Sequence, residues 1–457
     1  MIVALGACIT LSVGNTQGVL LLLLTLSCVA FLCVVSYSRA VALAIVMMPL
    51  SMQIRVSSPS SILLAGASTF WLLIPFGFWF FDQTIRKDEE GRFDTGLLVV
   101  IAFMFWCILV SLVSGSFLDI FLAIRQFVIP CVTFVIVRKV LLKDTQGSRT
   151  IMFAFVSGGI LLTFFQYLWF TEHITAFIAG REVSTIDIVG GSRSVLGGRF
   201  DRMQSLIGGG PSNAGIYLFA VTWIGLGCGL FCSTTVLERV FYLIAAVCSS
   251  FVGFYTLSRS VGVFIVAVFV LVSIGSQSRR WVSVAAFLIA VFVMAVLALT
   301  RQFADSTLSE TIAQDSITWS NAFPEGMAML VGEGIITIGG GLVKGVATSD
   351  AFVDGGWPLV WRMLGIPGLV LPIVLLIYVL GCYLSTARDT VFAREKPKEW
   401  VISIMSGSCC IAMAVSSVHT AILVRPVSCI AFYALAAVTL YSANGYRHLP
   451  HAPEAAG

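Results

Sequence analysis

Charged residues are scarce in this chain: they make up 11% of its 457 residues, whereas apolar residues make up 58%. A soluble domain of this length needs more polar surface than that to cover itself, so a soluble globular fold is excluded. Apolar segments of about 20 residues, the length that crosses a hydrocarbon core, recur from end to end. The composition therefore predicts an all-α polytopic membrane protein with a single transmembrane domain over residues 1–443 and a disordered cytoplasmic tail over 444–457.

Nucleotide-binding and metal-binding motifs are also missing. The sequence contains neither a Walker A motif nor the glycine fingerprint of a dinucleotide-binding domain. Its 4 histidines and 12 cysteines form no zinc pattern, and the cysteines all fall in apolar segments, which leaves no disulfide framework. Cys228 and Cys232 are interpreted as packing residues. Basic residues are spread over many loops. We therefore expect no metal, no cofactor and no nucleic-acid partner.

The apolar segments predict 13 or 14 transmembrane helices. The expected spans are residues 17–37, 40–54, 62–81, 96–114, 118–137, 150–170, 212–232, 240–257, 260–275, 282–299, 366–385, 400–420 and 426–443, with a weaker segment at 2–14. One set of alternate loops carries Arg39, Arg86, Lys87, Arg92, Arg138, Lys139, Lys143, Arg149, Arg239, Arg279, Arg280, Arg388, Arg394, Lys396, Lys398 and Arg447. The opposite short loops carry only Arg55, Arg259 and Arg425. Because Lys and Arg collect on the cytoplasmic side, both termini are expected there.

Two long loops fall on the outer side, over residues 171–211 and 300–362. The first is rich in arginine, and Arg193, Arg199 and Arg202 lie close together among glycines. The second is mainly acidic. A guanidinium group offers a planar fork of donors that suits phosphate. The two loops therefore predict a shared site, with mutual salt bridges that dock the loops as the alternative.

Two further arginines lie within or beside the spans. Arg125 falls inside the expected span 118–137, where an arginine is costly and usually faces a cavity or a partner. The alternative is a structural pair that holds helices together. Arg259 lies at a tight outer turn, where it serves either as a snorkelling anchor or as a phosphate contact.

Three segments, taken together, resemble the O-antigen ligase and polymerase superfamily. Residues 256–262, Thr-Leu-Ser-Arg-Ser-Val-Gly, resemble that family's Ser-Arg-Gly box, with a serine in the place of the glycine. Residues 353–368, from Val-Asp-Gly-Gly-Trp to Gly-Ile-Pro-Gly, resemble its closing motif of an Asp or His followed by small and aromatic residues and Gly-x-x-Gly. Gly-Arg at 198–199 and Pro-Ser-Asn-Ala at 211–214 resemble its Arg-Gly and Pro-Asn stretch. The resemblance covers about residues 190–385.

The closing motif separates two branches of this superfamily. Asp354 stands where the ligases carry a histidine, and residues 300–362 contain no histidine. The chain therefore looks more like the Wzy-type polymerases, which join oligosaccharide repeat units carried on undecaprenyl diphosphate. The resemblance implies an inverting glycosyltransferase of the GT-C type at the periplasmic face of the bacterial inner membrane. It implies neither a nucleotide sugar nor a required metal.

This chemistry assigns roles to the candidate residues. Cations stabilise the diphosphate leaving group, and the favoured ones are Arg199, Arg202 and Arg259, followed by Arg193 and Arg125. A carboxylate takes the proton of the acceptor hydroxyl, with Asp354 favoured over Glu325 and Glu333. Alternatively, Asp354 only orients an arginine such as Arg362. Trp357 stacks on a sugar face or anchors the chain at the membrane interface.

Two other functions remain open. One is an O-antigen ligase that transfers glycan to lipid A core, and the other is a polytopic transporter or flippase. A transporter is expected to show paired broken helices and ionisable groups at mid-membrane. For the polymerase, the expected partners are the lipid-linked oligosaccharide donor and acceptor and the bilayer itself. A chain-length regulator and a flippase are further candidate partners.

Overall fold

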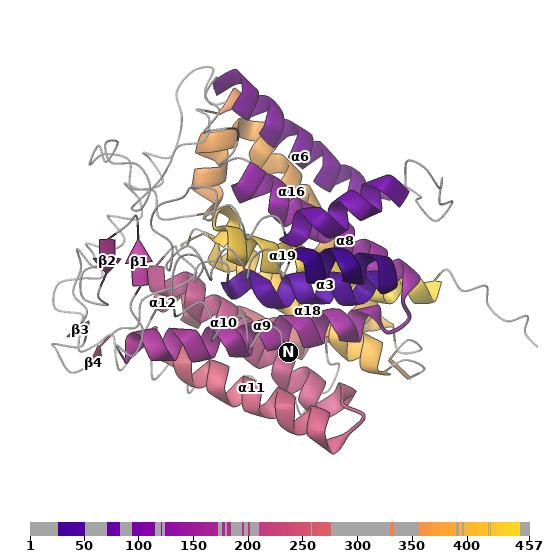
Figure 1. Ribbon diagram of the computed structural model, residues 1–457, viewed down its shortest axis with the longest axis vertical. Coiled ribbons are helices and arrows are strands. Elements are labelled where there is room, and N and C mark those ends of the chain that lie inside the picture. Colours follow the sequence, from indigo (N-terminus) through magenta and orange to yellow (C-terminus); the bar gives the residue numbers. More distant parts are fainter. Residues whose placement is uncertain are drawn as a thin grey trace, which may run out of the picture.

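The structure is a computed structural model and is almost entirely helical (Figure 1). It describes residues 26–50, 71–82, 94–114, 120, 124–171, 176–178, 181–183, 194–195, 200–201, 210–256, 258–275, 330–332, 356–389, 393–394, 397–418, 420 and 422–447. Six helices in these ranges are long and apolar enough to cross a membrane. They are α6 (Thr95–Ser114), α9 (Gly147–Phe170), α10 (Gly210–Gly227) continued by the π-helix η3 (Cys228–Cys232), α11 (Val236–Phe254), α16 (Gly356–Arg388) and α18 (Pro397–Ser416).

The other described helices are not among these six. They are Leu26–Val35, α3 (Tyr37–Met47) with the 3-10 turn η1 (Met48–Leu50), Trp71–Asp82, the π-helix η2 (Ile124–Val128), α8 (Ile129–Lys143), α12 (Arg259–Gly275), the 3-10 turn η4 (Ile422–Val424) and α19 (Pro426–Arg447). The apolar helices confirm the predicted class, a helical multi-pass membrane protein. The predicted spans 2–14 and 282–299 lie outside the described residues.

The centre of the bundle is built by α19, which packs against α8 and α18 (Figure 1). Every residue from 427 to 441 is buried, so this part of α19 is surrounded by other helices on all sides. One of its hydroxyl groups is satisfied within the helix: Thr439 Oγ1 donates to the carbonyl oxygen of Leu435 over 2.8 Å. By contrast, α6 and α11 lie at opposite edges of the bundle in Figure 1.

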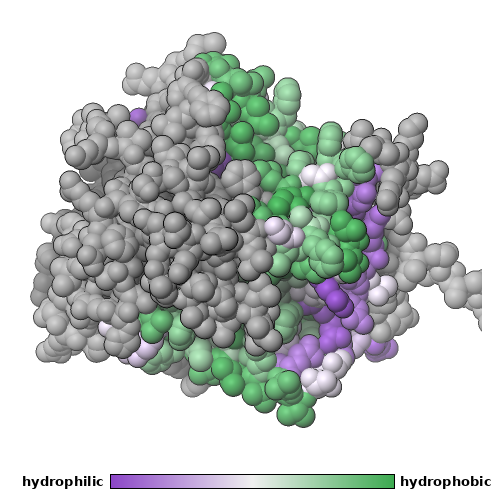
Figure 2. Space-filling view, in the orientation of Figure 1, coloured by the Kyte–Doolittle hydropathy of each residue, from purple (hydrophilic) through white to green (hydrophobic). Residues whose placement is uncertain are grey.

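One end of the bundle, here called the charged end, holds three ion pairs. Arg138 Nη2 lies 2.9 Å from Asp94 Oδ2, Lys139 Nζ lies 2.6 Å from Asp82 Oδ2, and Arg149 Nη2 lies 3.1 Å from Glu238 Oε1. These six residues define the charged end. Figure 2 shows hydrophilic residues gathered along the right-hand edge of the described surface, beside a largely apolar face.

Arg138 and Lys139 differ in position from the sequence prediction. The predicted span ended at residue 137 and placed both in a loop, but α8 continues to Lys143 and buries both side chains. The carboxylates described above compensate their charges, and each cation also lies over a ring, Arg138 over Tyr441 and Lys139 over Tyr37. Both residues still lie at the end that the charge pattern assigned to the cytoplasm.

The opposite end, here called the hairpin end, carries two small antiparallel hairpins. The strand β1 (Ala176–Ile178) pairs with β2 (Arg181–Val183), and β3 (Ser194–Val195) pairs with β4 (Phe200–Asp201). They lie at the left of the view in Figure 1 and belong to the predicted outer loop 171–211. The sequence analysis did not anticipate these strands, because two or three residues are too few for a periodic pattern.

Candidate functional site

Two motif segments, Pro-Ser-Asn-Ala at 211–214 and Thr-Leu-Ser-Arg at 256–259, meet at the hairpin end. Ser212, in the first turn of α10, and Ser258, which directly precedes α12, are 46 positions apart, yet their Oγ atoms lie 2.6 Å apart. Gly215 lies so close to this turn that a Cβ there would overlap Thr256 Oγ1 and Val261 Cγ2. The Pro-Ser-Asn-Ala and Thr-Leu-Ser-Arg segments therefore lie side by side.

The turn before Arg259 is fixed by local hydrogen bonds. Thr256 is fully buried, and its Oγ1 donates to the carbonyl oxygen of Gly253 over 2.6 Å. The carbonyl oxygen of Ser258 accepts the N–H of Val261 over 3.1 Å and closes the first turn of α12. Arg259 is thus the first residue of α12 at the hairpin end. Its side chain lies outside the described part of the chain.

The closing motif lies at the same end as Arg259. Gly275, at the other end of α12, lies close to Ile404 of α18 and Tyr383 of α16, so α12 and α18 run antiparallel. The last turn of α18 therefore reaches the hairpin end. There the N–H of Gly356, the first residue of α16, donates to the carbonyl oxygen of Ser417 over 2.7 Å. The motif that contains Trp357 and Arg362 thus starts at this end.

The helix α16 starts earlier than the sequence predicted and breaks once. Its 33 residues would measure about 50 Å as one helix, more than the hydrocarbon core of about 30 Å. At Gly365 the backbone leaves the helical region (φ 66°, ψ −167°), and Pro367 follows in the first turn of the next segment. Residues 356–364, which the prediction placed in a loop, form a short separate helix. Residues 366–388 agree with the predicted span.

Trp357 is buried within the bundle. Only 8% of it is exposed, and its Nε1 donates to the carbonyl oxygen of Ala414 over 2.8 Å. This hydrogen bond ties residues 356–364 to α18. The ring is packed among helices and is not exposed in the way that stacking on a sugar requires. Arg362, in the same short helix, is half-buried.

Arg125 lies near the beginning of residues 124–143, the continuous helical stretch that the structure describes here. It belongs to the π-helix η2, and Pro130 follows one turn later in α8. Proline has no N–H to donate to the preceding turn, which explains the local departure from α-helical geometry. About four turns separate Arg125 from Lys139 at the charged end, so the half-buried Arg125 lies toward the hairpin end.

The other predicted site residues are not placed. Asp354, Arg193, Arg199, Arg202, Glu325 and Glu333 lie outside the described residues. In sequence, Arg193 directly precedes β3 and Arg199 directly precedes β4. The sequence analysis missed Ser212 and Ser258 as a pair, although both belong to segments it singled out. A contact between hydroxyl groups so far apart in sequence leaves no local pattern.

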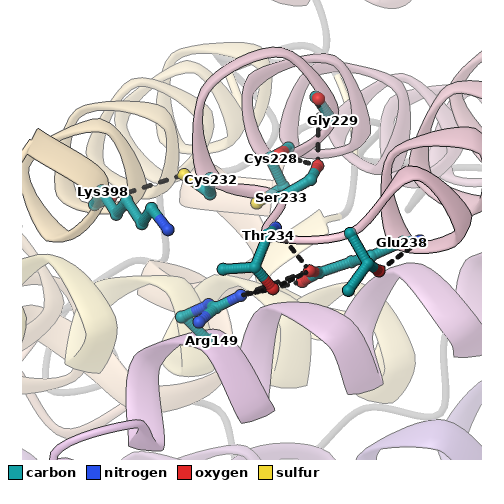
Figure 3. A network of polar contacts seen from close by, with 9 residues as sticks. Arg149, Cys228, Gly229, Cys232, Ser233, Thr234, Glu238 and Lys398 are labelled. Atoms are coloured by element: carbon teal, nitrogen blue, oxygen red, sulfur yellow. Dashed lines mark hydrogen bonds and ion pairs between the residues drawn. The ribbon is translucent and has the colours of Figure 1, made fainter.

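The charged end contains a second polar network, shown in Figure 3. Arg149 reaches Glu238, which also accepts the N–H of Thr234 over 2.8 Å. The N–H of Glu238 donates to Thr235 Oγ1 over 3.1 Å and caps α11. Beside it, Cys232 Sγ lies 3.5 Å from the carbonyl oxygen of Lys398. The first contacts join α9 to α11, and the last joins η3 to α18. A structural role therefore explains this network without a functional one.

Comparison with known proteins adds no family. No protein-family model matches this chain, and no curated protein matches it. The function is therefore inferred from the motifs, their chemistry and the geometry of the hairpin end.

Proposed function

We propose that this protein polymerises oligosaccharide repeat units carried on undecaprenyl diphosphate, at the periplasmic face of the bacterial inner membrane. The observation that carries the proposal is the contact between Ser212 and Ser258 at 2.6 Å, because it joins two of the three motif segments at one end of the bundle. The third segment begins at the same end with Gly356. Motifs that are remote in sequence and adjacent in space are typical of a functional site.

In the proposed reaction, the acceptor hydroxyl attacks the anomeric carbon of the donor and the bond to the lipid diphosphate breaks. Negative charge develops on the diphosphate, and Arg199, Arg202 and Arg259 stabilise it. Asp354 takes the proton of the attacking hydroxyl, or orients an arginine that binds the donor. The apolar faces of the outer helices accept the polyprenyl chain from the bilayer.

An in vitro reaction tests this function. The purified protein is given one defined undecaprenyl-diphosphate-linked repeat unit, and the products are separated by length. A ladder of longer lipid-linked chains, with release of undecaprenyl diphosphate, is the expected result. Failure to extend several such units under conditions in which the protein stays folded and monodisperse argues against a polymerase.

The glycans of cells that lack the gene distinguish a polymerase from a ligase. Loss of long chains, with single repeat units still attached to lipid A core, is the polymerase outcome. Loss of every attached chain is the ligase outcome.

The break in α16 is relevant to the transporter alternative, since broken helices often line transport sites. It lies at the tenth of the 33 residues of α16, however, and residues 366–388, about 34 Å long, are long enough to cross the membrane without it.

A further inference from the structure

The short helix over residues 356–364 is tied to other helices at both of its ends. At its start, the N–H of Gly356 donates to the carbonyl oxygens of Ser417 and Thr420, over 2.7 and 2.9 Å. At its last residue, the carbonyl oxygen of Leu364 accepts the indole N–H of Trp106 over 2.7 Å. Trp106 belongs to α6, so this segment bridges α6 and the turn between α18 and α19.

The bond from Trp106 supports the turn that contains Arg362. The backbone leaves the helical region at Gly365, directly after Leu364. Trp106 supplies a side-chain donor to the carbonyl oxygen of Leu364, the last residue before this break. Arg362 lies in this same turn, two residues before Leu364. Loss of the indole N–H would leave a carbonyl group without its partner and loosen the turn.

Backbone from another segment closes on the break. A Cβ at Gly365 would overlap the carbonyl oxygen of Leu330, and a Cβ at Gly332 would overlap that of Met363. Both glycines have positive φ, 66° and 92°, a region that other residues rarely adopt. The position of the last turn is thus set by close neighbours on more than one side, and Trp106 contributes a side-chain hydrogen bond to it.

We propose that Trp106 is a positioning residue that holds Arg362 where it binds the diphosphate of a polyprenyl-diphosphate donor. This inference rests on the proposed function, which supplies the ligand. Trp106 acts through the backbone of Leu364 and does not itself contact the donor. The arginine is suited to the role because its guanidinium group binds phosphate oxygens through paired N–H donors whose geometry depends on where the side chain is held.

Binding of undecaprenyl diphosphate to the purified full-length protein in detergent tests this role without requiring turnover. Trp106→Phe keeps an aromatic ring and removes the N–H. Trp400→Phe is the matched control, since Trp400 Nε1 donates to the carbonyl oxygen of Thr386 over 3.1 Å, near the opposite end of α16. Trp106→Phe is expected to raise the Kd about fivefold, and Trp400→Phe to change it less than about twofold.

A double-mutant cycle tests whether Trp106 affects binding through Arg362. Arg362→Gln is expected to raise the Kd, and Trp106→Phe is expected to add little in that background. Additive effects, wild-type binding by the Trp106 variant, or wild-type binding by Arg362→Gln would each overturn the positioning role. If Arg199→Ala still weakens binding in that case, the proposed function stands. A wild-type protein that does not bind undecaprenyl diphosphate overturns both.

Discussion

At the scale of single residues, hydroxyl groups in this protein have two kinds of partner. Several buried ones donate to a carbonyl oxygen four positions earlier, as Thr133 does to Ile129 and Ser408 does to Ile404. Such bonds add little to tertiary structure, because both groups belong to one helix. The pair formed by Ser212 and Ser258 instead links two separate segments. Its loss therefore has consequences beyond one helix.

The variant Ser258→Ala is expected to destabilise the protein by about 1 kcal/mol, because Ser212 loses a partner in a half-buried position. Thermal unfolding in detergent measures the effect. Ser250→Ala is the control, since Ser250 is exposed to its surroundings along α11 and donates only to Val247 of its own helix. Equal melting temperatures for both variants would contradict a linking role.

Arg199→Ala and Arg259→Ala are expected to abolish chain extension while the protein still inserts into the membrane. The reason is that the leaving diphosphate loses a cation in a site where charge is poorly screened. Glycan chain length and membrane abundance are measured together. Arg239→Ala provides the control, because Arg239 is exposed near the charged end. Normal chain length in both site variants would refute the diphosphate clamp.

Asp354→Asn distinguishes the two roles considered for this carboxylate. If Asp354 is the base, the rate falls by at least about a hundredfold, as for loss of a general base. If it orients an arginine through a hydrogen bond, the amide keeps part of that interaction and the loss is smaller. The measurement is kcat with the lipid-linked repeat unit. Wild-type kcat would remove Asp354 from the site.

At the scale of elements, the break in α16 converts an overlong helix into one membrane span and one short helix. The sequence prepares the break through Gly365 and Pro367, since glycine tolerates positive φ and proline starts a helix more readily than it continues one. The break also sets where the short helix over residues 356–364 ends.

The variant Gly365→Ala is expected to reduce the amount of folded protein severely. The new Cβ would be forced into a positive-φ conformation and would overlap the carbonyl oxygen of Leu330. Gly381→Ala, in the same helix, is the control, because a Cβ there meets no atom within 4 Å. Size-exclusion profiles of the two variants give the comparison. A monodisperse Gly365→Ala protein would mean that the two backbones can separate without loss of the fold.

At the scale of the whole molecule, the charged end holds together helices that are far apart in sequence. Asp94 accepts from both Arg138 and the hydroxyl group of Tyr441, and so connects α6, α8 and α19. The Arg138 side chain is only 7% exposed. An arginine buried to this extent is tolerated because the carboxylate stays beside it. The pair therefore fixes which helix ends meet.

Asp94→Leu is expected to destabilise the protein by about 3–5 kcal/mol, since it leaves the charge of Arg138 buried without this carboxylate. The double variant Asp94→Leu with Arg138→Met is expected to recover most of the loss, because no buried charge remains. Melting temperatures in detergent test this order. A double variant that is less stable than Asp94→Leu alone would show that the pair acts otherwise than through charge compensation.

A feature of this protein can be predicted from its sequence when it depends on residues that are close together in the chain. Hydropathy and charge are local, so they gave the membrane class, most described spans and the separation of charged residues to one end. They also singled out the segments around Arg259 and Arg362. Two predictions of a loop were wrong, because both segments are helical. Arg138 was placed in a loop because a buried cation is unfavourable until its carboxylate is known, and residues 356–364 were placed in a loop because they are short.

What the sequence by itself determined is therefore the class of molecule and the chemistry available to it. Only the tertiary structure decided which segments meet: Ser212 with Ser258, Arg138 with Asp94, and Trp106 with Leu364. Each of these contacts joins residues more than 40 positions apart and depends on how helices pack. Packing is set by the shapes of many side chains at once, so no single stretch of sequence encodes it.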